Sequence, residues 1–359
     1  MQVTKLVWST FLASAVLTAD QRLTVLKRAQ VWHPTKVASM DLKAGPQGKG
    51  AFAPGETITC DYVKEEFAGH SPKFACVVDG DDRLKVRYGR ENGEAYAMVA
   101  ATRLLWALGF GADAVYPVHI VCHGCPRELV GDSEAPRGET RFDIAAVERK
   151  FSGRDLEAPS VGAGWAWPEI DRVDEAAGGA PLAQRDALKL LAVMLQHTDS
   201  KAEQQRLVCL DNEKDKDRKK GKHKEKHDAK DATCEAPFMM IHDVGQTFGR
   251  ANLLNRTELG SVNLERWAAA PVWRDAAHCV ANLTPSQSGT LAHPVISEAG
   301  RKFLSDLLAQ LSDRQIADMF LVARFGERPL PNGLSGSSIE SWMDAFKKKR
   351  QEIAAATCP

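Results

Sequence analysis

The stretch that most constrains the fold is an apolar run, ALKLLAVMLQ at residues 187–196, which ends abruptly in a polar segment. From about Gln184 to Gln196 the pattern predicts a helix that is apolar on nearly all sides after Lys189, so it should be buried. The polar segment, HTDSKAEQQ at residues 197–205, combines one His, two acids, one Lys and two Gln. A solvated loop and a metal and phosphate site would both explain it.

The size and charge of the chain limit the classes of function. At 359 residues it is long enough for two lobes, each with its own core. The formal net charge is zero, so no overall field draws the protein to nucleic acid, and any binding of a polyanion has to be local. We expect a nucleotide and an acceptor as partners and no nucleic acid.

The N-terminal segment resembles a secretory signal peptide. A stretch without charges runs from Leu6 to Ala19 after Lys5; it is too short to span a bilayer but suits the apolar region of a signal. Ala13-Ser14-Ala15 fits the rule for cleavage after small residues, and Ala19 is a second, poorer site. A buried first helix is the alternative. We expect a signal peptide at residues 1–19, a periplasmic or secreted protein, and no membrane span after cleavage.

Eight cysteines favour the same conclusion, because an even number in an oxidising compartment suggests disulfides. Cys122 and Cys125 form the motif CHGC, which in other settings is redox-active or half of a zinc site. No second CxxC appears, and CHGC follows an apparent strand rather than preceding a helix. We therefore interpret it as a structural bridge.

The first part of the chain is rich in predicted strands. FAGHSPKFACVVDGDDRLKVRYG at residues 67–89 reads as two short strands joined by DGDD, which is a hairpin signal. Apolar residues then recur at helical spacing from Met98 to Leu108, and Gly109 suits the C-terminal cap. AVYPVHIVC at residues 114–122 is a further strand. These elements predict a small β-rich N-lobe with one helix, over residues 20–120.

The remainder, residues 121–359, is predicted to form a larger, mainly helical C-lobe, so that the whole is α+β and bilobal. Two short strands, RLVCL and PFMMI, flank a charged insert at residues 211–233 that cannot bury enough apolar surface to fold. A disulfide between Cys209 and Cys234 would hold the base of this insert. The last third is helical, with Ser297 as the N-cap of one helix.

Polar residues in this plan suit phosphoryl transfer. That reaction needs a cation near the phosphates, oxygen ligands for a divalent metal, and a carboxylate that orients the attacking hydroxyl. Lys85 and Arg87 share one face of a predicted strand because side chains alternate, and Glu94 opens the next helix within reach of Lys85.

The acids come from two later segments. Asp199 follows the buried helix, and Gln204 lies five residues beyond it, with Gln205 as the neighbouring option. Asp243-Val244-Gly245 ends an apolar strand, where an acid is poorly solvated unless it is paired or ligates a metal. We expect the buried helix to act as a rigid base that fixes Asp199 beside Asp243.

The order of LKVRYG, HTDSKAEQQ and IHDVGQTFG over residues 66–250 resembles the atypical kinase-like superfamily: HipA-type kinases, phosphatidylinositol kinases and secretory-pathway kinases of the Golgi casein kinase type. The resemblance implies a bilobal kinase-like fold with ATP between the lobes. It implies Asp199 as the catalytic base, Gln204 and Asp243 as ligands of Mg²⁺ or Mn²⁺, and Lys85 on the phosphates. Glu94 would be the helix partner of Lys85.

The chain departs from the family pattern at three places. Gln204 stands where the metal-binding amide is usually Asn, and Met98 competes with Glu94 for the position of the helix carboxylate. There is no GxGxxG loop; AGHSPKF offers Ser71 and Lys73 as phosphate contacts, with Arg87 beside Lys85.

Three classes of function follow. The leading hypothesis is an exported phosphotransferase that uses ATP and a divalent metal on an unknown acceptor, which is a protein, a lipid or a small molecule. Nucleotidyl transfer on the same scaffold is a related enzymatic reading. The second class is a catalytically degenerate kinase-like protein kept for binding or as a scaffold, and the third is a thiol-redox or metal protein centred on CHGC.

Overall fold

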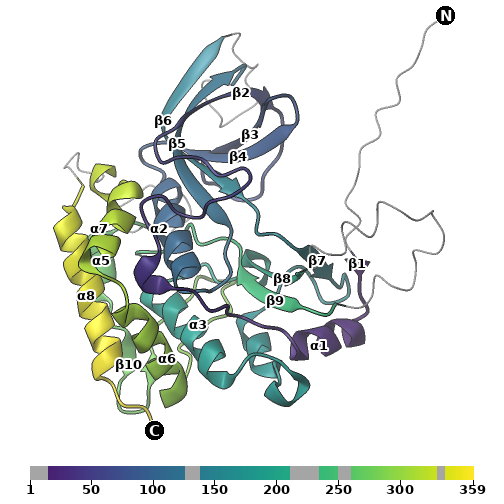
Figure 1. Cartoon of the computed structure of the whole chain (residues 1–359), viewed down its shortest axis with the longest axis vertical. Coiled ribbons are helices and arrows are strands. Elements are labelled where there is room, and N and C mark those ends of the chain that lie inside the picture. The colour runs from purple at the N-terminus through teal and green to yellow at the C-terminus, as the bar shows by residue number, and fades with distance from the viewer. Residues whose placement is uncertain (1–14, 126–137, 211–233, 250–259, 330–335) are drawn as a thin grey trace, which may run out of the picture.

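The computed structural model describes residues 15–125, 138–210, 234–249, 260–329 and 336–359, and it contains both helices and sheets (Figure 1). A closed barrel lies at one end of the molecule, and helices α3, α6 and α8 lie toward the other. The charged insert 211–233 and most of the predicted signal peptide lie outside the described residues.

The barrel is built from five strands in the order β2-β3-β4-β6-β5, with β2 and β5 parallel and the other pairs antiparallel. The predicted hairpin is confirmed as β3 and β4. The last strand of the barrel, β6, lies beyond residue 120, in the part of the chain that was predicted to be mainly helical. The strands are β2 (Thr57–Val63), β3 (Lys73–Val78), β4 (Asp82–Tyr88), β5 (Ala114–His123) and β6 (Glu139–Arg149).

Helix α2 (Glu94–Ala107) packs against β5 and carries the predicted helical face into the core. Met98, Leu104 and Leu108 are fully buried. Gly109 follows the helix with a φ of 86°, and a Cβ there would lie 2.0 Å from the His33 carbonyl oxygen. Only glycine fits such a left-handed, crowded position, so the helix ends there.

A second sheet has the order β1-β7-β8-β9. Strands β8 and β9 match the two predicted apolar strands, and they pair antiparallel. Their central residues are buried, and the two strands lie below the barrel in Figure 1. The strands are β1 (Ala15–Val16), β7 (Arg154–Glu157), β8 (Gln205–Cys209) and β9 (Pro237–Ile241).

The predicted central helix is confirmed as α3, which is buried along most of its length and packs against α6. Ser297 caps α6 as expected, since its Oγ accepts the Gly300 N–H. The other described elements are α1 (Ala19–Lys27), α3 (Leu182–Met194), α5 (Leu264–Ala269), β10 (Trp273–Asp275), β11 (Val280–Ala281), α6 (Glu298–Ala309), α7 (Asp313–Val322) and α8 (Ile339–Ala355).

All eight cysteines form disulfides, which suits a protein of an oxidising compartment. CHGC is a buried bridge, as interpreted, and the disulfide at the base of the insert is confirmed. The pairs are Cys60–Cys76, Cys122–Cys125, Cys209–Cys234 and Cys279–Cys358.

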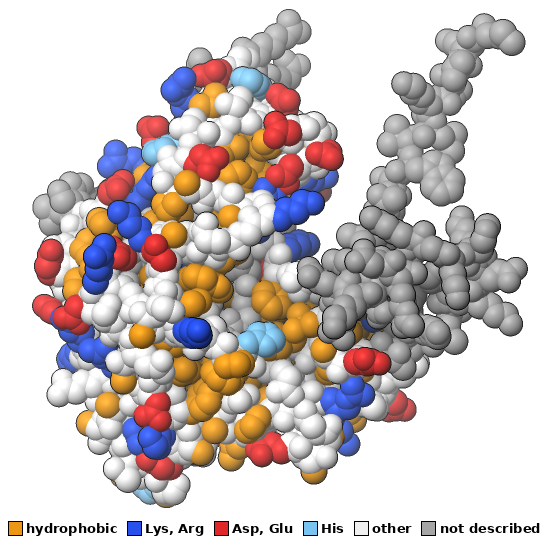
Figure 2. Space-filling view, in the orientation of Figure 1, with side chains coloured by type: hydrophobic (Ala, Val, Ile, Leu, Met, Phe, Trp, Pro, Cys, Tyr) orange, Lys and Arg blue, Asp and Glu red, His pale blue; other side chains and the backbone are white. Residues whose placement is uncertain are grey.

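The surface carries charges of both signs. Acidic and basic side chains lie interspersed across the face in Figure 2, in line with the zero net charge. Within the described ranges, no helix has the length and apolar character needed to cross a bilayer.

Replacing Cys279 and Cys358 by Ala should lower the free energy of unfolding by about 4 kcal/mol, because this disulfide restrains a long loop in the unfolded chain. The two cysteines are 79 residues apart, whereas Cys209 and Cys234 are 25 apart. Replacing the latter pair should therefore cost about 1 kcal/mol less. Urea unfolding of both double variants measures the difference, and the opposite order would contradict the loop-length argument.

Candidate functional site

A cavity of about 780 Å³ lies between the barrel and the loops that follow α3 and β9. Residues from β3, β4 and α2 line one side, and residues from the two loops line the other. Every site residue predicted from the sequence lies on its wall. These residues are Ser71, Lys73, Lys85, Arg87, Glu94, Asp199, Gln204 and Asp243.

Strand alternation places the two cations of β4. Leu84 and Val86 point into the barrel core, so Lys85 and Arg87 lie on the opposite face and reach the cavity, as expected. Arg87 is deeply buried, with 2% of its side chain exposed, whereas Lys85 keeps 24%.

Arg87 is the central charge of the cavity wall. Its Nη1 donates to Glu94 Oε2 over 3.0 Å, its Nη2 donates to Asp243 Oδ2 over 2.7 Å, and Glu148 lies 3.7 Å away. Burial alone would lower the pKa of Arg87, but the carboxylates, Asp243 foremost, outweigh it and raise the pKa. For Asp243, burial favours the neutral acid, but Arg87 and Lys85 hold the pKa of its carboxyl well below the usual range.

The prediction that Lys85 pairs with Glu94 is wrong. Lys85 Nζ instead lies 3.0 Å from Glu148 Oε2, because β6 pairs directly with β4 and Glu148 is the register partner of Lys85. Glu94 instead accepts hydrogen bonds from Arg87 and from Ser71, whose Oγ donates to it over 2.6 Å.

Glu94 faces the cavity, and Met98 does not replace it. The Met98 sulfur contacts Arg87 Nε from the buried side, one turn further along α2. Gly245 permits the approach of Glu94 to the loop after β9, since a Cβ there would lie 2.8 Å from Glu94 Cγ. A larger residue at Gly245 of the DVG motif would therefore collide with Glu94, which explains the glycine at this position.

Asp199 is held by three neighbours. Gln204 Nε2 donates to its Oδ2 over 3.1 Å, Ser286 Oγ donates to its Oδ1 over 3.2 Å, and Lys201 Nζ lies 3.4 Å away. A carboxylate with both oxygens engaged keeps one orientation toward the cavity.

Gln204 also joins the two acid-bearing loops. Its carbonyl oxygen accepts the N–H groups of His242 and Asp243, over 2.7 and 3.1 Å, while its side chain binds Asp199. Further along, the Phe248 N–H donates to the carbonyl of Leu195 at the end of α3. The buried helix therefore anchors both loops, and Asp199 and Asp243 line the same cavity as expected.

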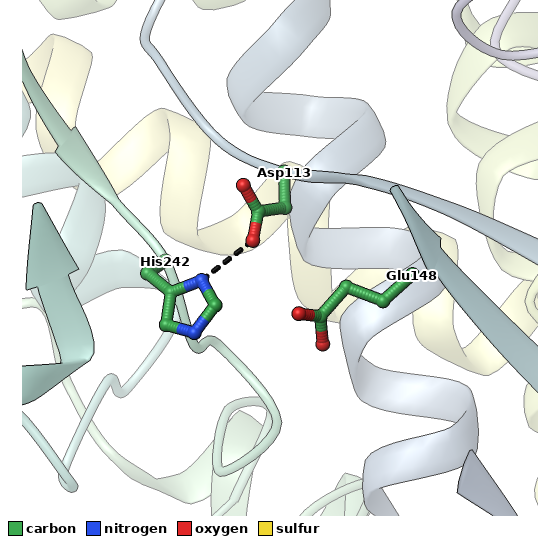
Figure 3. Close-up of side chains that lie close together, drawn as sticks. All are labelled: Asp113, Glu148 and His242. Atoms are coloured by element: carbon green, nitrogen blue, oxygen red, sulfur yellow. Dashed lines mark hydrogen bonds and ion pairs between the residues drawn. The ribbon is translucent and has the colours of Figure 1, made fainter. Parts of the chain in front are cut away.

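His242 lies beside two further acids, Asp113 and Glu148 (Figure 3). Its Nδ1 is 2.5 Å from Asp113 Oδ2, and one ligand atom from each residue lies within 4.8 Å of the others. Burial would lower the pKa of His242, but the hydrogen bond and the charge of Asp113, together with the charges of Glu148 and Asp243, outweigh burial and raise the pKa. The group contains the ligand types of a metal site.

Cations already balance this group. Lys85 and Arg87 flank Glu148, and Arg206 Nη1 lies 3.6 Å from Asp113. A divalent ion here would meet three positive charges at close range, which Coulomb repulsion disfavours. We therefore interpret the group as a charge network that supports the cavity wall.

His197, the first residue of HTDSKAEQQ, does not act as an exposed positive charge at the end of helix α3. It is fully buried next to Trp167, and burial lowers its pKa to about 4, so the ring is neutral at pH 7. The start of HTDSKAEQQ is therefore not a solvated loop, although Lys201 is partly exposed and Glu203 is exposed.

Sequence reasoning missed two parts of the site. One is Glu148, whose signal was a lone acid directly after the apolar residues of IAAVE. The other is the segment 284–288, TPSQS, which lines the cavity next to Asp199. This segment is fastened to the Asp199 loop by main-chain bonds from Ser286 to Thr198 and from Thr290 to Ser200. No local pattern marks such a pairing.

Arg87→Met should lower the free energy of unfolding by about 3–5 kcal/mol at neutral pH, because it leaves buried carboxylates without a counter-charge. Arg83→Met on the same strand is the matched control. Arg83 is half exposed and forms a surface ion pair with Glu65, so its loss should cost less than about 1 kcal/mol. Chemical unfolding of the three proteins measures this, and equal losses would remove Arg87 from its central place.

No protein-family model matches the sequence, and no curated protein matches it significantly. Among solved structures, the fold is similar to that of the proinflammatory kinase CtkA of Helicobacter pylori, with a TM-score of 0.41 and 11% identity. The match covers 84% of this chain and 95% of that chain. The similarity to this kinase is distant.

Proposed function

We propose that the protein is an exported phosphotransferase that moves a phosphoryl group from ATP to an acceptor hydroxyl with the help of Mg²⁺ or Mn²⁺. The acceptor is a protein, a lipid or a small molecule. The observation that carries the proposal is the cavity of about 780 Å³, in which cations from the barrel face acids from the loops after α3 and β9. Phosphoryl transfer is catalysed mainly by such positioning and charge complementarity.

The barrel side suits the phosphates. Lys73, Lys85 and Arg87 present positive charge to the cavity, and Ser71 adds a hydroxyl donor. Glu148 and Glu94 hold Lys85 and Arg87 in place, so little side-chain ordering is left for ligand binding.

The loop side suits the metal and the acceptor. Gln204 and Asp243 would hold the divalent ion, which prefers oxygen ligands and neutralises charge on the phosphates. Gln204 Nε2 is used on Asp199, so its amide oxygen is the atom left for a cation. Asp243 Oδ1 accepts the Gly245 N–H over 3.0 Å, which fixes the carboxylate. Asp199, oriented by Ser286 and Gln204, would accept the proton of the acceptor hydroxyl.

Export is part of the proposal. It is supported by the signal-like N-terminal segment and by the pairing of all eight cysteines. The burial of Cys122 and Cys125 in a disulfide disfavours the thiol-redox alternative, because a reactive thiol has to be accessible.

A catalytically degenerate scaffold is the second candidate. It is favoured by the 2.7 Å contact between Arg87 and Asp243, since an internal cation already neutralises the acid that would hold the metal. Gln204 in place of the usual Asn points the same way.

Thermal unfolding separates the two candidates. An ATP–metal complex that binds only the native state has to raise the melting temperature. We expect a rise with ATP plus Mg²⁺ or Mn²⁺ that disappears with EDTA. No rise with any nucleotide–metal pair would favour the scaffold.

Asp199→Asn and Asp243→Asn should each reduce ATP hydrolysis and autophosphorylation by about 10²-fold or more, because one removes the base and the other a metal ligand. Asp306→Asn is the matched control, since Asp306 is exposed on α6 and forms a surface ion pair with Lys302. Radiolabelled ATP provides both readouts. Activity that survives in both cavity variants would place the active site elsewhere.

A further inference from the structure

The segment 284–288, TPSQS, places a hydroxyl group directly against the proposed catalytic base. Ser286 Oγ donates to Asp199 Oδ1 over 3.2 Å, and Lys201 Nζ lies 3.4 Å from the same oxygen. A base has to lie within hydrogen-bond reach, roughly 2.6–3.2 Å, of the hydroxyl whose proton it removes. Ser286 therefore has the relation to Asp199 that an acceptor hydroxyl needs, with a positive charge close by.

Main-chain hydrogen bonds dock this segment beside the Asp199 loop. The Ser286 N–H donates to the Thr198 carbonyl over 2.7 Å, and the Thr290 N–H donates to the Ser200 carbonyl over 3.0 Å. The two bonds flank Asp199, because they use the carbonyls of the residues before and after it. Proteins hold extended peptides in a similar way, since main-chain bonds supply the affinity and single side chains the specificity. The segment thus resembles an acceptor peptide that belongs to the chain itself.

A tight turn fixes Ser286 in this place. The Gly289 N–H donates to the Ser286 carbonyl over 2.9 Å, and a Cβ on Gly289 would lie 2.9 Å from Ser200 Oγ. The turn therefore packs closely against the loop after α3. Ser286 is partly buried, whereas Thr284 and Ser288, the other hydroxyl residues of the segment, are exposed. The fold thus presents one of the three hydroxyl groups to the base.

We infer that Ser286 is the acceptor of an intramolecular phosphoryl transfer, so that the protein phosphorylates itself there. This inference rests on the proposed function and names its acceptor as a serine hydroxyl in a peptide segment. Ser286 Oγ forms a bond to the γ-phosphorus of ATP, and the bond from that phosphorus to the β–γ bridging oxygen breaks. ADP leaves with the electron pair of the broken bond, and the hydroxyl proton passes to Asp199. The cations that suit the phosphates, Lys73, Lys85 and Arg87, line the same cavity as Ser286.

Phosphosite mapping by mass spectrometry tests the inference on the full chain, after phosphatase treatment and incubation with ATP and Mg²⁺ or Mn²⁺. We expect phosphate on Ser286. Its rate of incorporation should not change over about thirtyfold dilution of the protein, because a hydroxyl that is already positioned reacts within one chain.

Three results would contradict the inference. Hydrolysis of ATP without phosphate on Ser286, or with phosphate on Thr284 or Ser288 in its place, would overturn it and leave the proposed function standing. A rate that rises in proportion to the protein concentration would show transfer between chains and would overturn it as well. Neither hydrolysis nor incorporation would overturn both the inference and the proposed function.

One substitution separates an acceptor from a residue that only orients Asp199. Ser286→Ala should lower the phosphate incorporated per ATP hydrolysed by about tenfold or more, because other hydroxyl groups are not positioned for transfer. Both quantities scale with the folded fraction, so a loss of stability does not change this ratio. Ser341→Ala, at an exposed position of α8, is the matched control and should keep the wild-type ratio. An unchanged ratio in Ser286→Ala would reduce Ser286 to a positioning residue and overturn the inference.

Discussion

The buried guanidinium of Arg87 is the interaction on which the site depends. It comes from β4 and meets carboxylates from α2, from β6 and from the loop after β9. Glu94 is only seven residues from Arg87, but Asp243 lies 156 residues away, so this side chain links the barrel to the loop after β9. Removing one partner of such a group leaves an uncompensated buried charge, which costs far more than a surface pair. The same contact orients Asp243 and limits its freedom to ligate a metal.

On the other side of the cavity, hydrogen bonds that involve main-chain atoms hold the loops after α3 and β9 together. The Gln204 side chain donates a hydrogen bond to Asp199, and its main-chain carbonyl accepts hydrogen bonds from the loop after β9. The Phe248 N–H connects that loop to the end of α3. Both acids thus sit on loops whose ends are fixed by a buried helix, which is how a loop residue acquires a defined geometry. Because the bonds to the Gln204 carbonyl and from the Phe248 N–H use backbone atoms, substitutions of the side chains around them can change the chemistry of the cavity and leave these two links in place.

Much of the local structure could be predicted from the sequence, because it follows from periodicity. Helix α3 was marked by its apolar run, the β3–β4 hairpin by DGDD, and the common face of Lys85 and Arg87 by strand alternation. The pairing of charges could not be predicted. Lys85 meets Glu148, 63 residues away, because β6 closes the barrel beside β4. Such register depends on contacts between distant segments, for which a local pattern carries no signal.

The closed barrel also determines how this molecule can meet other chains. A barrel has no free strand edge, so its main-chain donors and acceptors are paired all the way round. In the second sheet, single bridges from Gln30 to Phe238 and from Ala112 to Ile241 cover the outer side of β9. Growth by strand addition is thereby blocked at both places, which protects the chain against edge-to-edge aggregation there.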